Sequence, residues 1–220
     1  MSDRWREAGE APCLWSWLQL EAREPGSVVE VLGWARMQAV SSLTTQHVSR
    51  ELLQQVRQHR GLRRLRVTEH KSGGGHMHYG AFAQLARTLA GLEEVDMCGA
   101  QLDKQQIDSL FAALDLGSGA LRKLTIVRTV LFYVEPGLLA RVVNRLEDVT
   151  LVKVGLNRQQ AEAILQQVRL GSALRRLNIA SNTRYLATVE PALLAAAVNR
   201  LQEFDMSDTG LTREQVLERS

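Results

Sequence analysis

The sequence is short of the residues that mark several common protein classes. It has only 2 cysteines among 220 residues, too few for a disulfide framework or a cysteine-based zinc site. Aromatic residues make up 5% of the chain although hydrophobic residues make up 45%, so the apolar mass is mostly Leu, Val and Ala. Such side chains suit thin, uniform layers of helix and strand better than an aromatic-rich β-sandwich.

Long hydrophobic runs are also missing. The longest, ALLAAAV, covers residues 192–198, whereas a membrane-spanning helix needs about 20 apolar residues. The N-terminal stretch MSDRWREAGEAP carries charges and no apolar core, so we expect no secretory signal. The sequence therefore predicts a cytoplasmic or nuclear protein without a membrane partner.

What the chain does have is an internal repeat. Six segments carry apolar residues at their first, fourth and sixth positions. They begin at Leu62, Leu92, Leu121, Leu146, Leu174 and Leu201, at intervals of 30, 29, 25, 28 and 27 residues. Each segment has the pattern of a short strand followed by a helix, and neither would bury its apolar face alone. Stacked neighbours would supply both the strand pairing and the core.

The predicted helices begin in two ways. One kind has a polar N-cap residue with glutamine three positions on, as in a capping box. These pairs are Asp103 with Gln106, Asn157 with Gln160, and Thr212 with Gln215. The other kind begins at Pro136 or Pro191, in the near-identical stretches VEPGLLARVVNRL and VEPALLAAAVNRL. Their separation of 55 residues, two units, indicates that a pair of units was duplicated.

The pattern L-x-x-L-x-L at this period resembles a leucine-rich repeat of the ribonuclease-inhibitor-like class. The resemblance runs from about Leu62 to the C-terminus and implies an α/β horseshoe-shaped solenoid, with parallel strands on the concave side and helices on the convex side. The family's asparagine at the ninth position of the unit occurs once, as Asn182. The other units have His70, Ala100, Thr129, Val154 and Thr209 at that position.

Charges alternate in sign from one predicted strand to the next. At their second and third positions the units have Arg63-Arg64, Glu93-Glu94, Arg122-Lys123, Glu147-Asp148, Arg175-Arg176 and Gln202-Glu203. Parallel strands lie about 4.8 Å apart, so each charge would lie between opposite charges. The pattern fits either a structural ladder of ion pairs, each worth about 0.2–1 kcal/mol, or a charge-patterned recognition surface. A nucleic-acid-binding face would carry one sign, so we expect no nucleic-acid partner.

The fifth position of each unit varies more freely and would face the concave side. We predict that these residues bind a protein partner: Arg66, Asp96, Thr125, Thr150, Asn178 and Asp205. No serine elbow, Cys/His pair or pair of carboxylates stands out in the sequence. We therefore predict that the chain is not an enzyme and needs no cofactor.

The stretch EHKSGGGHMHYG, residues 69–80, interrupts the repeat. His70, His76 and His78 are candidate metal ligands, but no second ligand pair or carboxylate triad accompanies them. A glycine triplet without a following Lys-Thr or Lys-Ser is not a phosphate loop. We interpret the stretch as a surface loop and predict no metal site.

The N-terminal stretch DRWREAGEAPCLWSWLQL forms an apolar cluster that would cap the open end of the array. It also resembles the closing third of an F-box, which has a Trp-Arg helix, a short acidic segment, a proline and then Leu-Trp. The front of an F-box, with its Leu-Pro motif, is missing. This resemblance implies that Trp5, Leu14 and Trp15 contact a Skp-type adaptor.

We therefore divide the chain into three parts. Residues 1–25 form a Trp-rich cap with an F-box-like remnant, residues 26–61 a degenerate first repeat with a strand around Val40 and Leu43, and residues 62–220 the leucine-rich repeats. The predicted function is protein–protein recognition, as a substrate-receptor-like subunit of a cullin-type ubiquitin ligase or a truncated relative. The alternative is a free-standing cytosolic sensor or inhibitor that binds a protein ligand on the concave face.

Overall fold

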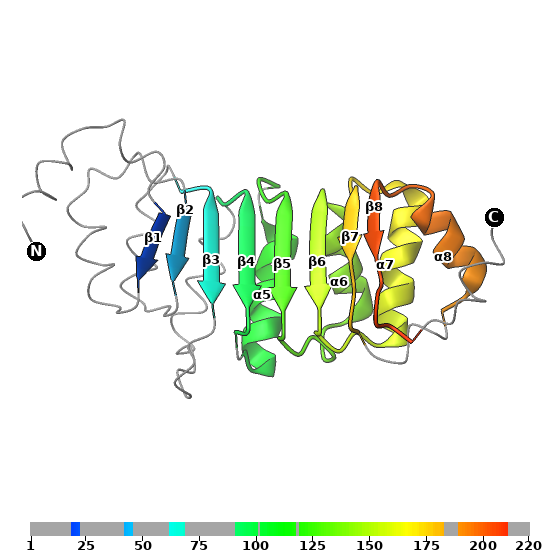
Figure 1. The fold of residues 1–220 in the computed structure, drawn as a ribbon, viewed down its shortest axis with the longest axis horizontal. Coiled ribbons are helices and arrows are strands. Elements are labelled where there is room, and N and C mark those ends of the chain that lie inside the picture. Colours follow the sequence, from blue (N-terminus) through cyan, green and yellow to red (C-terminus); the bar gives the residue numbers. More distant parts are fainter. Residues whose placement is uncertain are drawn as a thin grey trace, which may run out of the picture.

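The computed structural model describes residues 62–68, 91–100, 102–117, 119–182 and 189–210, the short strand 42–45, and the backbone of residues 19–22. This part of the chain is an α/β structure on one eight-stranded sheet (Figure 1). The strands are β1 (Gln19–Ala22), β2 (Ser42–Thr45), β3 (Arg64–Thr68), β4 (Glu94–Cys98), β5 (Lys123–Val127), β6 (Asp148–Val152), β7 (Arg176–Asn178) and β8 (Glu203–Asp205). The described helices are α5 (Lys104–Leu116), α6 (Pro136–Asn144), α7 (Arg158–Gly171) and α8 (Pro191–Val198).

The strands lie side by side in sequence order, and every neighbouring pair is parallel. This confirms the predicted α/β class and the six predicted parallel strands. Each begins two residues after the leading leucine of its unit. β2 contains Leu43, as expected, whereas Val40 lies outside the described residues. β1 falls within the predicted cap, where no strand was predicted.

The sheet has one buried face. Along β3, β4 and β5 the side chains alternate between buried and at least partly exposed positions. The residues at the fourth position of these units are no more than 2% exposed. They are Leu65, Val95 and Leu124. These side chains pack in one core with residues of the helices, among them Phe111 and Ile164. In Figure 1, α5 and α6 lie behind the strands and α7 and α8 lie at the β8 end of the sheet, and each helix packs on the next.

Two of the predicted capping boxes are present. The backbone N–H of Gln106 donates to Asp103 Oδ1 (2.8 Å) while the backbone N–H of Asp103 donates to Gln106 Oε1 (2.9 Å). Asn157 and Gln160 make the same reciprocal pair at the start of α7. The third predicted box, Thr212 with Gln215, lies outside the described residues. Pro136 and Pro191 occupy the first turns of α6 and α8, as predicted.

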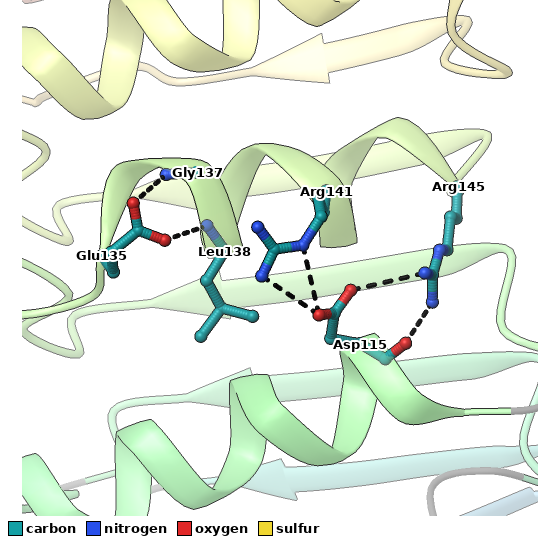
Figure 2. A network of polar contacts seen from close by, with 6 residues as sticks. All are labelled: Asp115, Glu135, Gly137, Leu138, Arg141 and Arg145. Carbon is teal, nitrogen blue, oxygen red and sulfur yellow. Dashed lines mark hydrogen bonds and ion pairs between the residues drawn. The ribbon is translucent and has the colours of Figure 1, made fainter.

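The N-cap of α6 and the link between α5 and α6 were not predicted from the sequence (Figure 2). Glu135 caps α6 by accepting hydrogen bonds from the backbone N–H groups of Gly137 and Leu138. Asp115, near the end of α5, lies 3.2 Å from Arg141 Nη2 and 3.4 Å from Arg145 Nη2. Arg145 also donates to the backbone carbonyl of Asp115. A guanidinium at the carboxyl end of a helix is electrostatically favourable, so this network joins consecutive units.

Each strand from β4 to β8 is followed by a residue with a positive φ. The residues are Gly99 (73°), Arg128 (59°), Lys153 (56°), Ser181 (55°) and Asp208 (56°). The first four donate their backbone N–H to a carbonyl of the next unit, as Arg128 does to Val152 O at 3.0 Å. The left-handed turn therefore extends the hydrogen-bond ladder between units beyond the strands themselves.

Asn182 bridges two units inside the core. Its side chain is buried and donates to the carbonyls of Leu151 and Ile179. Its Oδ1 accepts from the backbone N–H groups of Val154 (3.0 Å) and Leu156 (3.3 Å). At the same position of an earlier unit, the Thr129 hydroxyl donates to Ala100 O at 2.9 Å. Among the described helices none is long and apolar enough to cross a membrane.

Candidate functional site

The second face of the sheet, which we call the open face, is not covered by any described helix (Figure 1). Fully parallel sheets usually have helices on both faces, so an open face is the unusual feature of this fold. Its side chains form rows that cross the strands. The first row contains Arg64, Glu94, Lys123, Asp148, Arg176 and Glu203, each opposite the next in the strand register. The second row contains Arg66, Asp96, Thr125, Thr150, Asn178 and Asp205.

The second row is the complete set of predicted partner-binding residues. The strand register places all six in one line across β3 to β8, and each is partly or fully exposed. The sequence therefore predicted which residues lie together. That they contact a partner stays a prediction.

The alternating charges of the first row are in register, but they are not all paired. Arg64 Nε lies 3.1 Å from Glu94 Oε1. Asp148 Oδ2 lies 3.3 Å from Lys123 Nζ and 3.1 Å from Arg176 Nη2. In the described part of the chain no ion pair joins β4 to β5, because Glu94 contacts Arg64 and Lys123 contacts Asp148. The ladder of ion pairs is thus interrupted at its centre.

The residues just before the strands repeat this arrangement. Arg63 Nη1 lies 2.5 Å from Glu93 Oε1, and Arg122 Nη1 lies 2.9 Å from Glu147 Oε1. These side chains are 39–67% exposed, so water screens each pair and its contribution to stability is small. Together they form a rim with both signs of charge along the open face.

Asp96 has an incompletely satisfied carboxylate. Its Oδ2 lies 2.9 Å from Arg66 Nε, whereas its buried Oδ1 accepts no hydrogen bond within the described structure. Burial raises the pKa of the Asp96 carboxyl, and the nearby Arg66 and Lys123 only partly oppose this effect.

Asp205, at the other end of the second row, is in the opposite situation. The backbone N–H of Ser207 donates to its Oδ1 (3.0 Å), and Asn178 Nδ2 donates to its Oδ2 (3.1 Å). These bonds, the one from the Ser207 backbone above all, lower the pKa of the Asp205 carboxyl. The second row therefore has an acceptor in need of a donor at Asp96 and a satisfied carboxylate at Asp205.

Two shallow hollows lie over the described strands of the open face. The smaller, about 210 Å³, lies over β2 to β5 and is lined by residues that include Arg66, Asp96 and Lys123. The larger, about 550 Å³, lies over β5 to β8 around Asp148 and Asn178. Small-molecule sites are mostly apolar and enclosed, whereas charged and polar side chains dominate both hollows. The surface is better suited to a protein partner than to a small apolar ligand.

Other predicted site residues are not brought together by the described structure. Trp5, Leu14 and Trp15, the predicted adaptor contacts, lie outside the described residues, and so do His70, His76 and His78. Where the structure does describe the chain, it contains no group of three or more His, Cys, Asp or Glu side chains placed to hold a metal ion.

An exposed apolar group lies in the turn between β5 and α6. Val130, Phe132 and Tyr133 are 57%, 51% and 58% exposed. The two rings meet edge to face, with centroids 5.7 Å apart, and Lys104 Nζ lies 5.9 Å from the Tyr133 centroid. The apolar run TVLFYV, just before the helix that begins at Pro136, was the sequence signal for this group. Sequence reasoning missed it because a run of this kind is equally consistent with burial.

Comparison with known proteins adds no family to these observations. No protein-family model matches the chain, and a search of curated proteins finds no match.

Proposed function

We propose that the chain is a leucine-rich-repeat-like recognition module whose open face is the concave, protein-binding side of a horseshoe. The observation that carries the proposal is a fully parallel sheet whose described helices all lie on one side. Stacked repeats are the architecture that produces such a sheet, because each unit adds one strand and one helix in the same orientation. Extended concave faces of this kind are used to bind proteins.

The unit structure supports the same proposal. A strand recurs every 25–30 residues from β3 onward, followed by a left-handed turn in the five units from β4 to β8. Asn182, which stands at the position of the family's asparagine, bonds the backbone of two units. Thr129 performs part of that role with a single hydroxyl.

The charge pattern suggests the kind of partner. The first and second rows contain both signs of charge and uncharged polar groups. A nucleic acid would be repelled by the carboxylates, whereas a protein surface of mixed charge would find complementary groups. The proposed function is binding without catalysis.

The F-box-like stretch extends the proposal to a substrate-receptor-like subunit of a cullin-type ubiquitin ligase, or a truncated relative, in the cytoplasm or nucleus. Its support is the sequence resemblance at Trp5, Leu14 and Trp15. The second candidate is a free-standing sensor or inhibitor that binds a protein on the same face. A titration with purified Skp-type adaptor separates the two, since sub-micromolar binding that is lost in Trp15→Ala supports the first.

The test of the binding face is site-specific photo-crosslinking in an extract of the source cells. A photoreactive residue at Asn178 should capture a discrete protein, and Asp96→Lys should reduce its capture at least about tenfold, about 1.4 kcal/mol. The matched control places the same photoreactive residue at Arg169, which is exposed on α7. Equal capture of the same protein from both positions, or capture unaffected by Asp96→Lys, would contradict the proposal.

A further inference from the structure

The charge order of the first row has a symmetry of its own. Read from β3 to β8 the signs are plus, minus, plus, minus, plus, minus. An alternating row with an even number of charges presents opposite charges to its own reversed copy. The row is therefore complementary to itself.

Two copies whose open faces meet would realise this reversal. A two-fold axis along the strand direction, between β5 and β6, places β3 opposite β8, β4 opposite β7, and β5 opposite β6 of the second copy. The facing pairs in the first row are then Arg64 with Glu203, Glu94 with Arg176, and Lys123 with Asp148. Every pair is of opposite charge, and each occurs twice, as in an isologous interface.

The second row also has compatible facing residues under this two-fold axis, although its charges do not alternate in sign. The arrangement places Arg66 opposite Asp205, Asp96 opposite Asn178, and Thr125 opposite Thr150. Asn178 Nδ2 carries two hydrogens and donates to Asp205 within its own chain. Its second hydrogen would be available to the partly exposed carboxylate of Asp96, which faces Asn178 in this arrangement. Near the axis, Val127 would face Val152, and both are partly buried.

We propose that the open face binds the open face of a second copy of this chain, as a two-fold dimer held mainly by charge. The inference rests on the proposed function in that both use this face as a protein-binding surface, and it names one occupant. The dimer competes with any outside partner, so self-association would limit access to the face.

The geometry predicts a weak dimer. Six strands at about 4.8 Å and five residues at about 3.3 Å cover about 29 Å by 17 Å, or about 490 Å² per copy before side chains are counted, and two concave faces would meet over less than this area. Stable interfaces bury about 800 Å² per partner. The charged groups are also partly paired within each chain. Association in the micromolar range or weaker, with strong dependence on salt, is the expected result.

Sedimentation equilibrium of the 220-residue chain tests the dimer. Between about 0.1 M and 1 M salt the screening length falls from about 10 Å to about 3 Å, and the dissociation constant should rise at least about tenfold. Arg64→Glu and Glu203→Lys should each weaken the dimer at least tenfold, because each places like charges at both symmetry-related contacts. An equimolar mixture of the two variants restores opposite charges and should dimerise like the parent.

The controls make the same charge changes among the helices. Arg169→Glu on α7 and Glu190→Lys at the start of α8 alter exposed side chains that make no ion pair among the described residues, and both should leave the dimer unchanged. Glu203 is likewise exposed and makes no ion pair in the described structure, so Glu203→Lys tests the interface without breaking a pair within the chain.

Three results overturn the inference: a parent chain that stays monomeric at about 0.1 M salt, a dimer indifferent to Glu203→Lys, or a mixture of variants that fails to recover. Any of them leaves the proposed function in place, because capture of an outside protein is measured separately. Conversely, a failed capture experiment does not affect a dimer that follows the charge swap.

Discussion

Asp148 and Arg176 face each other across β6 and β7, with the carboxylate Oδ2 3.1 Å from both Nη2 and Nε of the guanidinium. Lys123 on β5 reaches the same oxygen from the other side, at 3.3 Å. The Asp148 side chain is 12% exposed, the least of the ion-paired carboxylates described on the open face. One carboxylate thus joins three consecutive strands.

Asp148→Asn should lower the free energy of unfolding by about 1–2 kcal/mol, because an amide cannot neutralise two cations over a partly buried position. The matched control is Glu147→Gln, which removes a 44% exposed carboxylate with one partner and should cost at most about 0.5 kcal/mol. Urea denaturation of both variants at low salt measures the difference. Equal losses in the free energy of unfolding would show that pairing with two cations does not make Asp148 more stabilising than Glu147.

The Arg64–Glu94 pair should show measurable coupling. Glu94→Arg places like charge beside Arg64 and in register with Lys123, and adding Arg64→Glu restores an opposite pair across β3 and β4. A coupling energy of about 0.2–1 kcal/mol is expected, since both side chains are at least 40% exposed. A double-mutant cycle from denaturant melts provides it. Strictly additive effects at low salt would mean that the pair does not stabilise the sheet.

Asp96→Asn should leave stability at neutral pH unchanged or increased. The folded-state pKa of Asp96 is raised by burial above its ordinary value of 3.8, so the folded protein binds this proton more tightly than the unfolded chain. The contribution of Asp96 to stability is therefore greatest below 3.8, falls as the pH rises through the raised pKa, and stays low above it. Denaturant melts from below pH 3.8 to neutral pH should show that Asp96→Asn lacks this decline in the free energy of unfolding.

Asp205→Asn is the control of opposite sign. Hydrogen bonds lower the pKa of Asp205, so its stabilisation is present above its ordinary pKa and is lost as the pH falls through the lowered one. The variant should therefore lose stability at neutral pH. If Asp96→Asn and Asp205→Asn follow the same pH trend, the assignment of one satisfied and one unsatisfied carboxylate is wrong.

Lys153→Gly should increase stability. Lys153 is exposed and has a φ of 56°, in the left-handed region. A side chain there costs about 1–2 kcal/mol, and the greater freedom of glycine in the unfolded chain offsets about 0.4–1 kcal/mol of the gain. Thermal or urea unfolding should show a net increase of up to about 1 kcal/mol. Lys153→Val, which places a β-branched side chain in the same turn, should instead lower stability.

Asn182→Ala should be the most damaging of these substitutions. It removes the partner of two carbonyls and two N–H groups within the core, and each buried group left without a partner costs about 1–3 kcal/mol. We expect a loss of at least about 3 kcal/mol, against about 1 kcal/mol for Thr129→Val, which removes one bond. Similar losses for both in urea melts would argue against Asn182 as the main link between units.

Local patterns in the sequence were sufficient to locate most elements. The apolar spacing in each unit predicted the six strands from β3 to β8, because alternation along a strand and burial of one face are local requirements. The capping boxes at Asp103 and Asn157 and the prolines at Pro136 and Pro191 predicted helix starts for the same reason. The residues of the second row were predicted to share one face from their position in the unit alone.

The tertiary structure decided how these residues use their neighbours. The sequence shows alternating charges, but only the packed strands determine that Asp148 takes two cations while β4 and β5 share no ion pair in the described region. The link from Asp115 to Arg141 and Arg145 joins residues 26–30 positions apart, beyond the reach of a local pattern. Ion pairs and hydrogen bonds act over a few ångströms, so their partners are chosen when the units stack, whereas periodicity and caps are set within each unit.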